Sequence, residues 1–132
     1  MKLIIAGSRT LTPSVTFIDS LICQYDIKIT EVVSGCANGV DLSGEKYYLQ
    51  YNEMGIRYHN PEVINLSLKQ FPANWDMFGK AAGHIRNKEM ADYADALLLI
   101  WDGESKGSAN MKDTMLKQNK PVLEVIIKTY NA

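Results

Sequence analysis

Residues 81–111 read AAGHIRNKEMADYADALLLIWDGESKGSANM. Residues 96–101 form an unbroken apolar run, which in a chain that alternates strands with helices is typical of a parallel strand covered on both faces. A helix is expected before this strand, at about residues 81–93, and a glycine-rich loop follows it. Ligands of open α/β sheets bind beyond the carboxyl ends of the strands. The stretch therefore predicts a buried strand with a binding loop at its end.

The loop at residues 102–108, DGESKGS, combines the residue types that bind phosphate. Its glycines allow close backbone approach, while its hydroxyls and lysine supply donors and charge. A helix is expected after it, at about residues 109–119, and the first amide groups of a helix lack acceptors within it. We expect a ligand phosphate here. The candidate ligand-binding residues are Asp102, Gly103, Ser105, Lys106, Gly107 and Ser108.

Two further glycine loops also follow expected strands. The strand at residues 2–6 ends in Gly7-Ser8-Arg9, which is either an anion loop or an ordinary turn with a surface arginine. The strand at residues 29–33 ends in SGCANGVD, whose final Asp41 could cap the next helix or reach a ligand hydroxyl. Because parallel strands share one carboxyl edge, we expect all three loops to converge there. The added candidates are Gly7, Ser8, Arg9, Ser34, Gly35, Gly39 and Asp41.

The rest of the chain continues the alternation of strands and helices. This order predicts an α/β fold, a Rossmann-like three-layer sandwich with a parallel sheet of about five strands, in one domain at residues 1–132. Thr12 and Pro13 are expected to begin the first helix. The first helix continues over residues 15–22. The other expected elements are a helix at 42–52, strands at 56–59 and 121–127, and an irregular segment at 60–79, which is either a loop or short helix that covers the cleft or an edge that wraps the core.

Composition narrows the classes of function. The net charge of -1 lacks the basic excess of proteins that grip nucleic acid, so a small anion is expected instead and a nucleic-acid partner is not. No apolar run approaches the roughly 20 residues of a membrane span, and Met1-Lys2 leads directly into a strand, so we expect a cytoplasmic protein without a membrane partner. Cys23 and Cys36 lack CxxC spacing and are expected to be free thiols, with no metal site.

Four ordered motifs span residues 1–10, 33–45, 81–95 and 101–111, and Lys120-Pro121-Val122 follows them. Together they resemble the SLOG superfamily of Rossmann-like nucleotide-binding domains, and within it the small YspA/YpsA-related proteins common in bacteria and phages. The resemblance implies a nucleotide or nucleotide-derived ligand bound across the three loops, with no further cofactor. It also implies a dimer. Tyr47, Tyr48 and Tyr51, which are expected to pack or to form a subunit contact, offer a candidate surface.

The helix at residues 81–93 is similar to that of more distant relatives, the LOG phosphoribohydrolases, which cleave the N-glycosidic bond of nucleoside monophosphates. Their motif H-x-R-K-x-x-M is matched by His84, Arg86 and Met90, with Asn87 in place of the lysine. Arg86 and Met90 are expected near one face, with Asn87 and Glu89 turned differently.

The loop that follows is similar to the family's P-G-G-x-G-T-x-x-E at Gly107 and Ser108, but Met111 stands in the place of the glutamate. Methionine can neither activate water nor stabilise the positive charge of glycosidic cleavage. We therefore predict a binder or sensor, with Arg9 or Arg86 as the anion clamp. Two alternatives stay open: a nucleotide hydrolase with Arg86 and Glu89 as catalytic candidates, and an interaction protein with a vestigial pocket.

Overall fold

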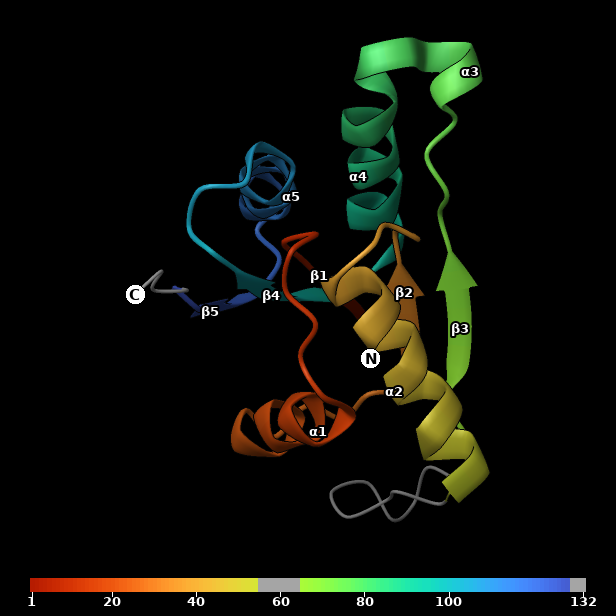
Figure 1. Ribbon diagram of the computed structural model, residues 1–132, viewed down its shortest axis with the longest axis vertical. Coiled ribbons are helices and arrows are strands. Elements are labelled where there is room, and N and C mark those ends of the chain that lie inside the picture. The colour runs from red at the N-terminus through yellow and green to blue at the C-terminus, as the bar shows by residue number, and fades with distance from the viewer. Residues whose placement is uncertain (55–64, 129–132) are drawn as a thin grey trace.

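The computed structural model describes residues 1–54 and 65–128 (Figure 1). Its five strands form one parallel sheet in the order β3-β2-β1-β4-β5. The chain adds strands on one side of β1 and then on the other, so the order switches between β1 and β4. The strands are β1 (Lys2–Gly7), β2 (Glu31–Ser34), β3 (Ser67–Gln70), β4 (Ala96–Trp101) and β5 (Val122–Ile126).

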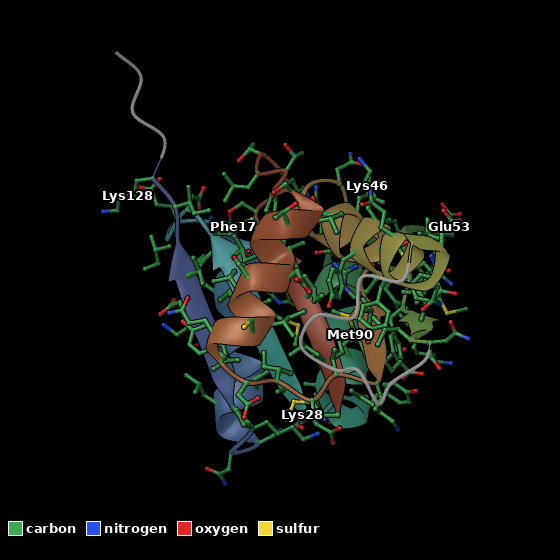
Figure 2. All side chains as sticks on the ribbon, turned by 90° about the horizontal axis from the view of Figure 1, so that it is seen from below. Phe17, Lys28, Lys46, Glu53, Met90 and Lys128 are labelled. Carbon is green, nitrogen blue, oxygen red and sulfur yellow. The ribbon has the colours of Figure 1, made fainter. Side chains whose placement is uncertain are left out.

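Helices cover both faces of the sheet, as predicted for an α/β three-layer fold (Figure 1). Successive residues of β1 point to opposite faces: Leu3 and Ile5 pack with α1 and α2, whereas Ile4 and Ala6 pack with α4 and α5. Figure 2 views the molecule from the α1 side. The helices are α1 (Val15–Gln24), α2 (Val40–Met54), α3 (Trp75–Phe78), the 3-10 helix η1 (Gly79–Ala81), α4 (Ala82–Tyr93) and α5 (Lys106–Lys117).

Three helices begin elsewhere than predicted, and of these α2 begins at Val40, two residues before the predicted start. Helix α1 is capped by Ser14, not Thr12, because the Ser14 hydroxyl accepts a hydrogen bond from the Phe17 amide at 3.1 Å. Helix α5 begins at Lys106, three residues before the predicted start, because the Asp102 side chain already folds the loop into a turn. Gly107 and Ser108, which were predicted to lie in the loop, therefore belong to the helix.

The segment predicted to be irregular contains two regular elements, β3 and α3. The sequence of β3, SLKQ, carries no apolar run because it is an edge strand with mostly exposed side chains, and it forms by pairing with β2. The strand predicted at residues 56–59 lies outside the described residues.

The tyrosines of α2 belong to the core. Tyr47 and Tyr51 are each 1% exposed, their ring centroids lie 5.9 Å apart, and the Tyr47 hydroxyl donates to Asp19 at 3.3 Å. Tyr48 is half-buried against the same core. The prediction that these tyrosines pack in the core is therefore confirmed. The alternative that Tyr47 and Tyr51 form a dimer surface is wrong, because their side chains face the sheet. Self-association stays a prediction. Across residues 1–54 and 65–128, no helix is long and apolar enough to cross a membrane.

Candidate functional site

A cavity of about 400 Å³ lies where the sheet order switches, at the carboxyl ends of β1 and β4. This is the place at which open α/β sheets bind ligands. The loop after β1 and the starts of α2 and α5 contribute to its walls, together with α3 and α4. The predicted residues that line it are Gly7, Arg9, Asp41, Arg86, Asp102, Ser105, Lys106, Gly107 and Ser108.

The first turn of α5 presents free amide groups to this cavity. The first intrahelical bond runs from the Ala109 amide to the Ser105 carbonyl at 3.0 Å. The amides of Lys106, Gly107 and Ser108 precede it and have no acceptor within the described part of the chain. A Cβ added to Gly107 would meet no atom within 4 Å. An anion can therefore approach the start of the helix without obstruction.

The loop before α5 is held by Asp102 and Ser8. One Asp102 oxygen accepts from the amides of Glu104 at 2.8 Å and Ser105 at 3.0 Å, and from the Ser105 hydroxyl at 3.1 Å. These hydrogen bonds lower the pKa of Asp102, and the bond from the Glu104 amide has the largest effect. The buried Ser8 hydroxyl accepts from the Asp102 amide at 3.0 Å. Both side chains thus shape the loop, and Ser8 acts from outside the lining of the cavity.

Arg86 and Asp41 face each other at the floor of the site. A Cβ added to Gly35 would lie 2.8 Å from both the Arg86 Nη1 atom and the Asp41 Oδ2 atom, so glycine leaves the space between them open. Burial raises the pKa of Asp41 to about 6, even though its carboxylate accepts from the Ala37 amide at 3.3 Å and lies near the arginine. Burial also lowers the pKa of Arg86.

Asn87 fixes the position of Arg86. Its side-chain oxygen accepts from the Arg86 Nε atom at 3.0 Å, and its amide donates to the Gly107 carbonyl at 3.2 Å and to Asn110 Oδ1 at 3.0 Å. The prediction that Asn87 turns away from the face of Met90 is wrong, because both are buried towards α5. The spacing of Gly83, Asn87 and Met90, at i, i+4 and i+7, is the sequence signal that indicates this face.

Several predicted glycines and serines support the loops from outside the cavity. Gly39 has a φ of +80°, and a Cβ on it would lie 2.4 Å from the Ser8 carbonyl oxygen. The fully buried Ser34 donates to Glu45 at 2.7 Å and accepts from the Cys36 amide at 3.1 Å. Gly103 forms a turn after β4 with a φ of +86°. These residues set the shape of the site but do not line this cavity.

The cavity gathers positive charge in a chain whose net charge is -1. Its lining includes Arg9, Lys80, Arg86 and Lys106 against the carboxylates of Asp41 and Asp102. Lys80 was not predicted. Trp75 lies in the segment that was predicted either to cover the cleft or to wrap the core; it lines the cavity, is 51% exposed, and its ring lies 3.5 Å from where a Gly83 Cβ would be. Residues 60–79 have no period that would place Trp75 beside the cavity.

Glu89 and Met111, the two residues that bear most on catalysis, differ in their position relative to the cavity. Glu89 is exposed on α4 and does not line the cavity. Met111 does line it and is 2% exposed, so an apolar side chain occupies the wall where the resemblance places a catalytic glutamate. No three histidine, cysteine or acidic side chains within residues 1–54 and 65–128 gather as a metal site.

The architecture defines a Rossmann-like α/β fold, and a cleft with several cationic side chains lies at its switch point. No protein-family model matches the chain, and no curated protein matches it. Its structure is similar to that of DNA processing protein A from Helicobacter pylori, for which a mode of binding single-stranded DNA is described. The two share 20% sequence identity with a TM-score of 0.65, over 100% of this chain and 68% of that one. At this identity the similarity shows the fold alone.

Proposed function

We propose that this protein binds a small nucleotide or nucleotide-derived ligand, as a binder or sensor, with a phosphate at the first turn of α5. One observation carries the proposal: the free amides beside Gly107 open into a cavity with four cationic side chains in a chain of net charge -1. Its volume of about 400 Å³ suits a small molecule.

The other lining residues suit the rest of a nucleotide. Lys106 and Arg9 are exposed at the cavity and can meet the phosphate from solvent, while Arg86 is held in place by its neighbours. The carboxylate of Asp41 is an acceptor for a ribose hydroxyl. The proposed binding site therefore includes Asp41, Arg86, Lys106 and Arg9 in addition to the first turn of α5.

The test is isothermal titration calorimetry with AMP, after a thermal-shift screen that includes NAD and ADP-ribose. Lys106→Ala should weaken AMP binding at least about tenfold, because a charge-assisted contact to phosphate contributes about 1.5 to 3 kcal/mol. Lys117→Ala, which removes the same charge at the other end of α5, is the matched control and should bind as the wild type does. If no nucleotide raises the melting temperature, the pocket is vestigial and an interaction protein is the better account.

A second candidate, a hydrolase that cleaves the N-glycosidic bond, is favoured by Asp41. It is a 4% exposed carboxylate at the cavity with a pKa raised to about 6, which is close to the range that acid–base catalysis requires. Chromatography of free base released from nucleoside monophosphates tests it. Turnover that disappears in Asp41→Asn but persists in Glu89→Gln would establish the enzyme, and absence of turnover with intact AMP binding supports the binder.

A further inference from the structure

A second cavity of about 310 Å³ adjoins the first. The two have four lining residues in common, Arg9, Ala37, Trp75 and Arg86, so they are two lobes of one cleft. The first lobe contains the start of α5. The second lobe lies over the loop that follows β2 and the segment before α3.

The side chains at the junction suit an anionic group. Arg86 uses two of its five N–H groups for the Gly35 carbonyl and the Asn87 side chain, which leaves others to donate to a ligand. Arg9 is exposed, and both arginines line both lobes. Two guanidinium groups at one position are typical of sites that bind phosphate.

The second lobe offers surfaces for a planar group. Pro72 and the exposed indole of Trp75 supply apolar contact area, and the exposed Asn38 amide carries both donors and an acceptor. Its floor is built with backbone strain, because Cys36 has a φ of +64° and its amide is held by the Ser34 hydroxyl at 3.1 Å. These are the contacts by which a nucleoside is recognised.

We propose that the second lobe is a nucleoside subsite, and that the ligand is a free dinucleotide in which two nucleoside units are joined through phosphates. One phosphate lies on the first turn of α5 and the other at Arg9 and Arg86, with one unit in each lobe. The inference rests on the proposed function and extends it. The net charge of -1 argues for a free dinucleotide over a nucleic-acid strand, whose further phosphates would need a basic surface.

Calorimetry with NAD, AMP and a ten-nucleotide oligothymidylate separates the alternatives. NAD should bind at least tenfold more tightly than AMP and than the oligonucleotide. Asn38→Ala should reduce the advantage of NAD and leave AMP binding unchanged. An affinity for NAD no better than that for AMP overturns the second subsite while the AMP binding itself sustains the proposed function. If neither binds, both proposals fail.

Alkylation of the two free thiols, followed by mass spectrometry, locates the second unit. Cys36 lines the second lobe, whereas Cys23 is exposed on α1 and serves as an internal control. Saturating NAD should slow the labelling of Cys36 at least fivefold, AMP should not, and Cys23 should react at one rate throughout. Unchanged labelling of Cys36 under saturating NAD contradicts the subsite. Tighter binding of the oligonucleotide, with Cys36 protected, overturns the free dinucleotide in favour of a strand.

Discussion

The glycine loops of this protein look alike in sequence but differ in what surrounds them. At the end of β1, a Cβ on Gly7 would lie 1.6 Å from the Ile100 carbonyl oxygen, and in the loop after β2 one on Gly39 would lie 2.4 Å from that of Ser8. In the first turn of α5, after β4, a Cβ on Gly107 would meet nothing within 4 Å. The first group is therefore closed by packing, and the second is open towards the cavity.

The difference separates two uses of glycine at one edge of a sheet. Gly7 and Gly39 allow the loop after β1 to sit directly on β4 and on the start of α2, which brings the walls of the cleft together. Gly107 leaves space beside helix amides that have no acceptor within the described residues, and an anionic ligand can supply one there. Substitution of Gly7 or Gly39 should consequently affect stability, whereas a bulky substitution of Gly107 should affect binding.

The largest effect is expected at Gly7. Gly7→Ala should lower the free energy of unfolding by about 4 kcal/mol, because its methyl group overlaps the backbone of β4, which cannot give way. Gly107→Ala is the matched control and should be neutral or stabilising by about 0.5 to 1 kcal/mol, since alanine is the better helix former. Urea denaturation measures both. Equal stabilities for the two variants would remove the distinction between the loops.

Asp41 sharpens the comparison, because it lies in the closed region yet lines the cavity. Its pKa of about 6 in the folded protein exceeds the ordinary value of 3.8, so the folded state holds the proton more tightly. The resulting stability is complete only well below about pH 4 and is lost as the pH rises through 6, a total of about 3 kcal/mol. The charged groups that act on it are Arg86 and Glu45, with the Cys36 thiol nearby.

The measurement is the free energy of unfolding of the wild type and of Asp41→Asn between pH 4 and pH 7. The wild type should lose about 2.5 kcal/mol more than the variant over this interval, because a part of the total is already lost at pH 4. The difference between the two proteins cancels the opposite effect of Asp92, Asp102 and Glu124, whose pKa values are lowered. Parallel curves would show that Asp41 is not a buried, titrating carboxyl.

Arg86 contacts Gly35 in the loop after β2 and, through Asn87, the start of α5, so its removal should affect both the stability of the fold and ligand binding. Arg86→Ala loses its bonds to Gly35 and Asn87 and any contact to a ligand phosphate. We expect stability and NAD binding each to fall by about 1.5 to 3 kcal/mol, with partial recovery in Arg86→Lys. Denaturation and calorimetry on the same samples decide it. If stability falls while affinity holds, the arginine serves only the fold.

The sequence best predicted the strand in which every residue is buried, because such a strand appears as an unbroken apolar run. The run ALLLIW has the predicted bounds as β4 because all six residues are buried, and its exit is where the cavity lies. The edge strand β3 escaped prediction because its polar residues pair only with β2. Trp75 lies at the cavity because of tertiary packing, which no local sequence period indicates. The difference between Gly7 and Gly107 likewise depends on which distant segments pack against each glycine, and the local sequence does not show this.

Calorimetric titration of AMP into Gly107→Val tests the central claim, that the first turn of α5 binds a phosphate. The substituent enters open space, so the variant should fold with close to the wild-type melting temperature while its side chain obstructs the free amides. The account predicts a loss of affinity of at least about tenfold, or 1.4 kcal/mol. Wild-type affinity in a folded Gly107→Val would contradict it.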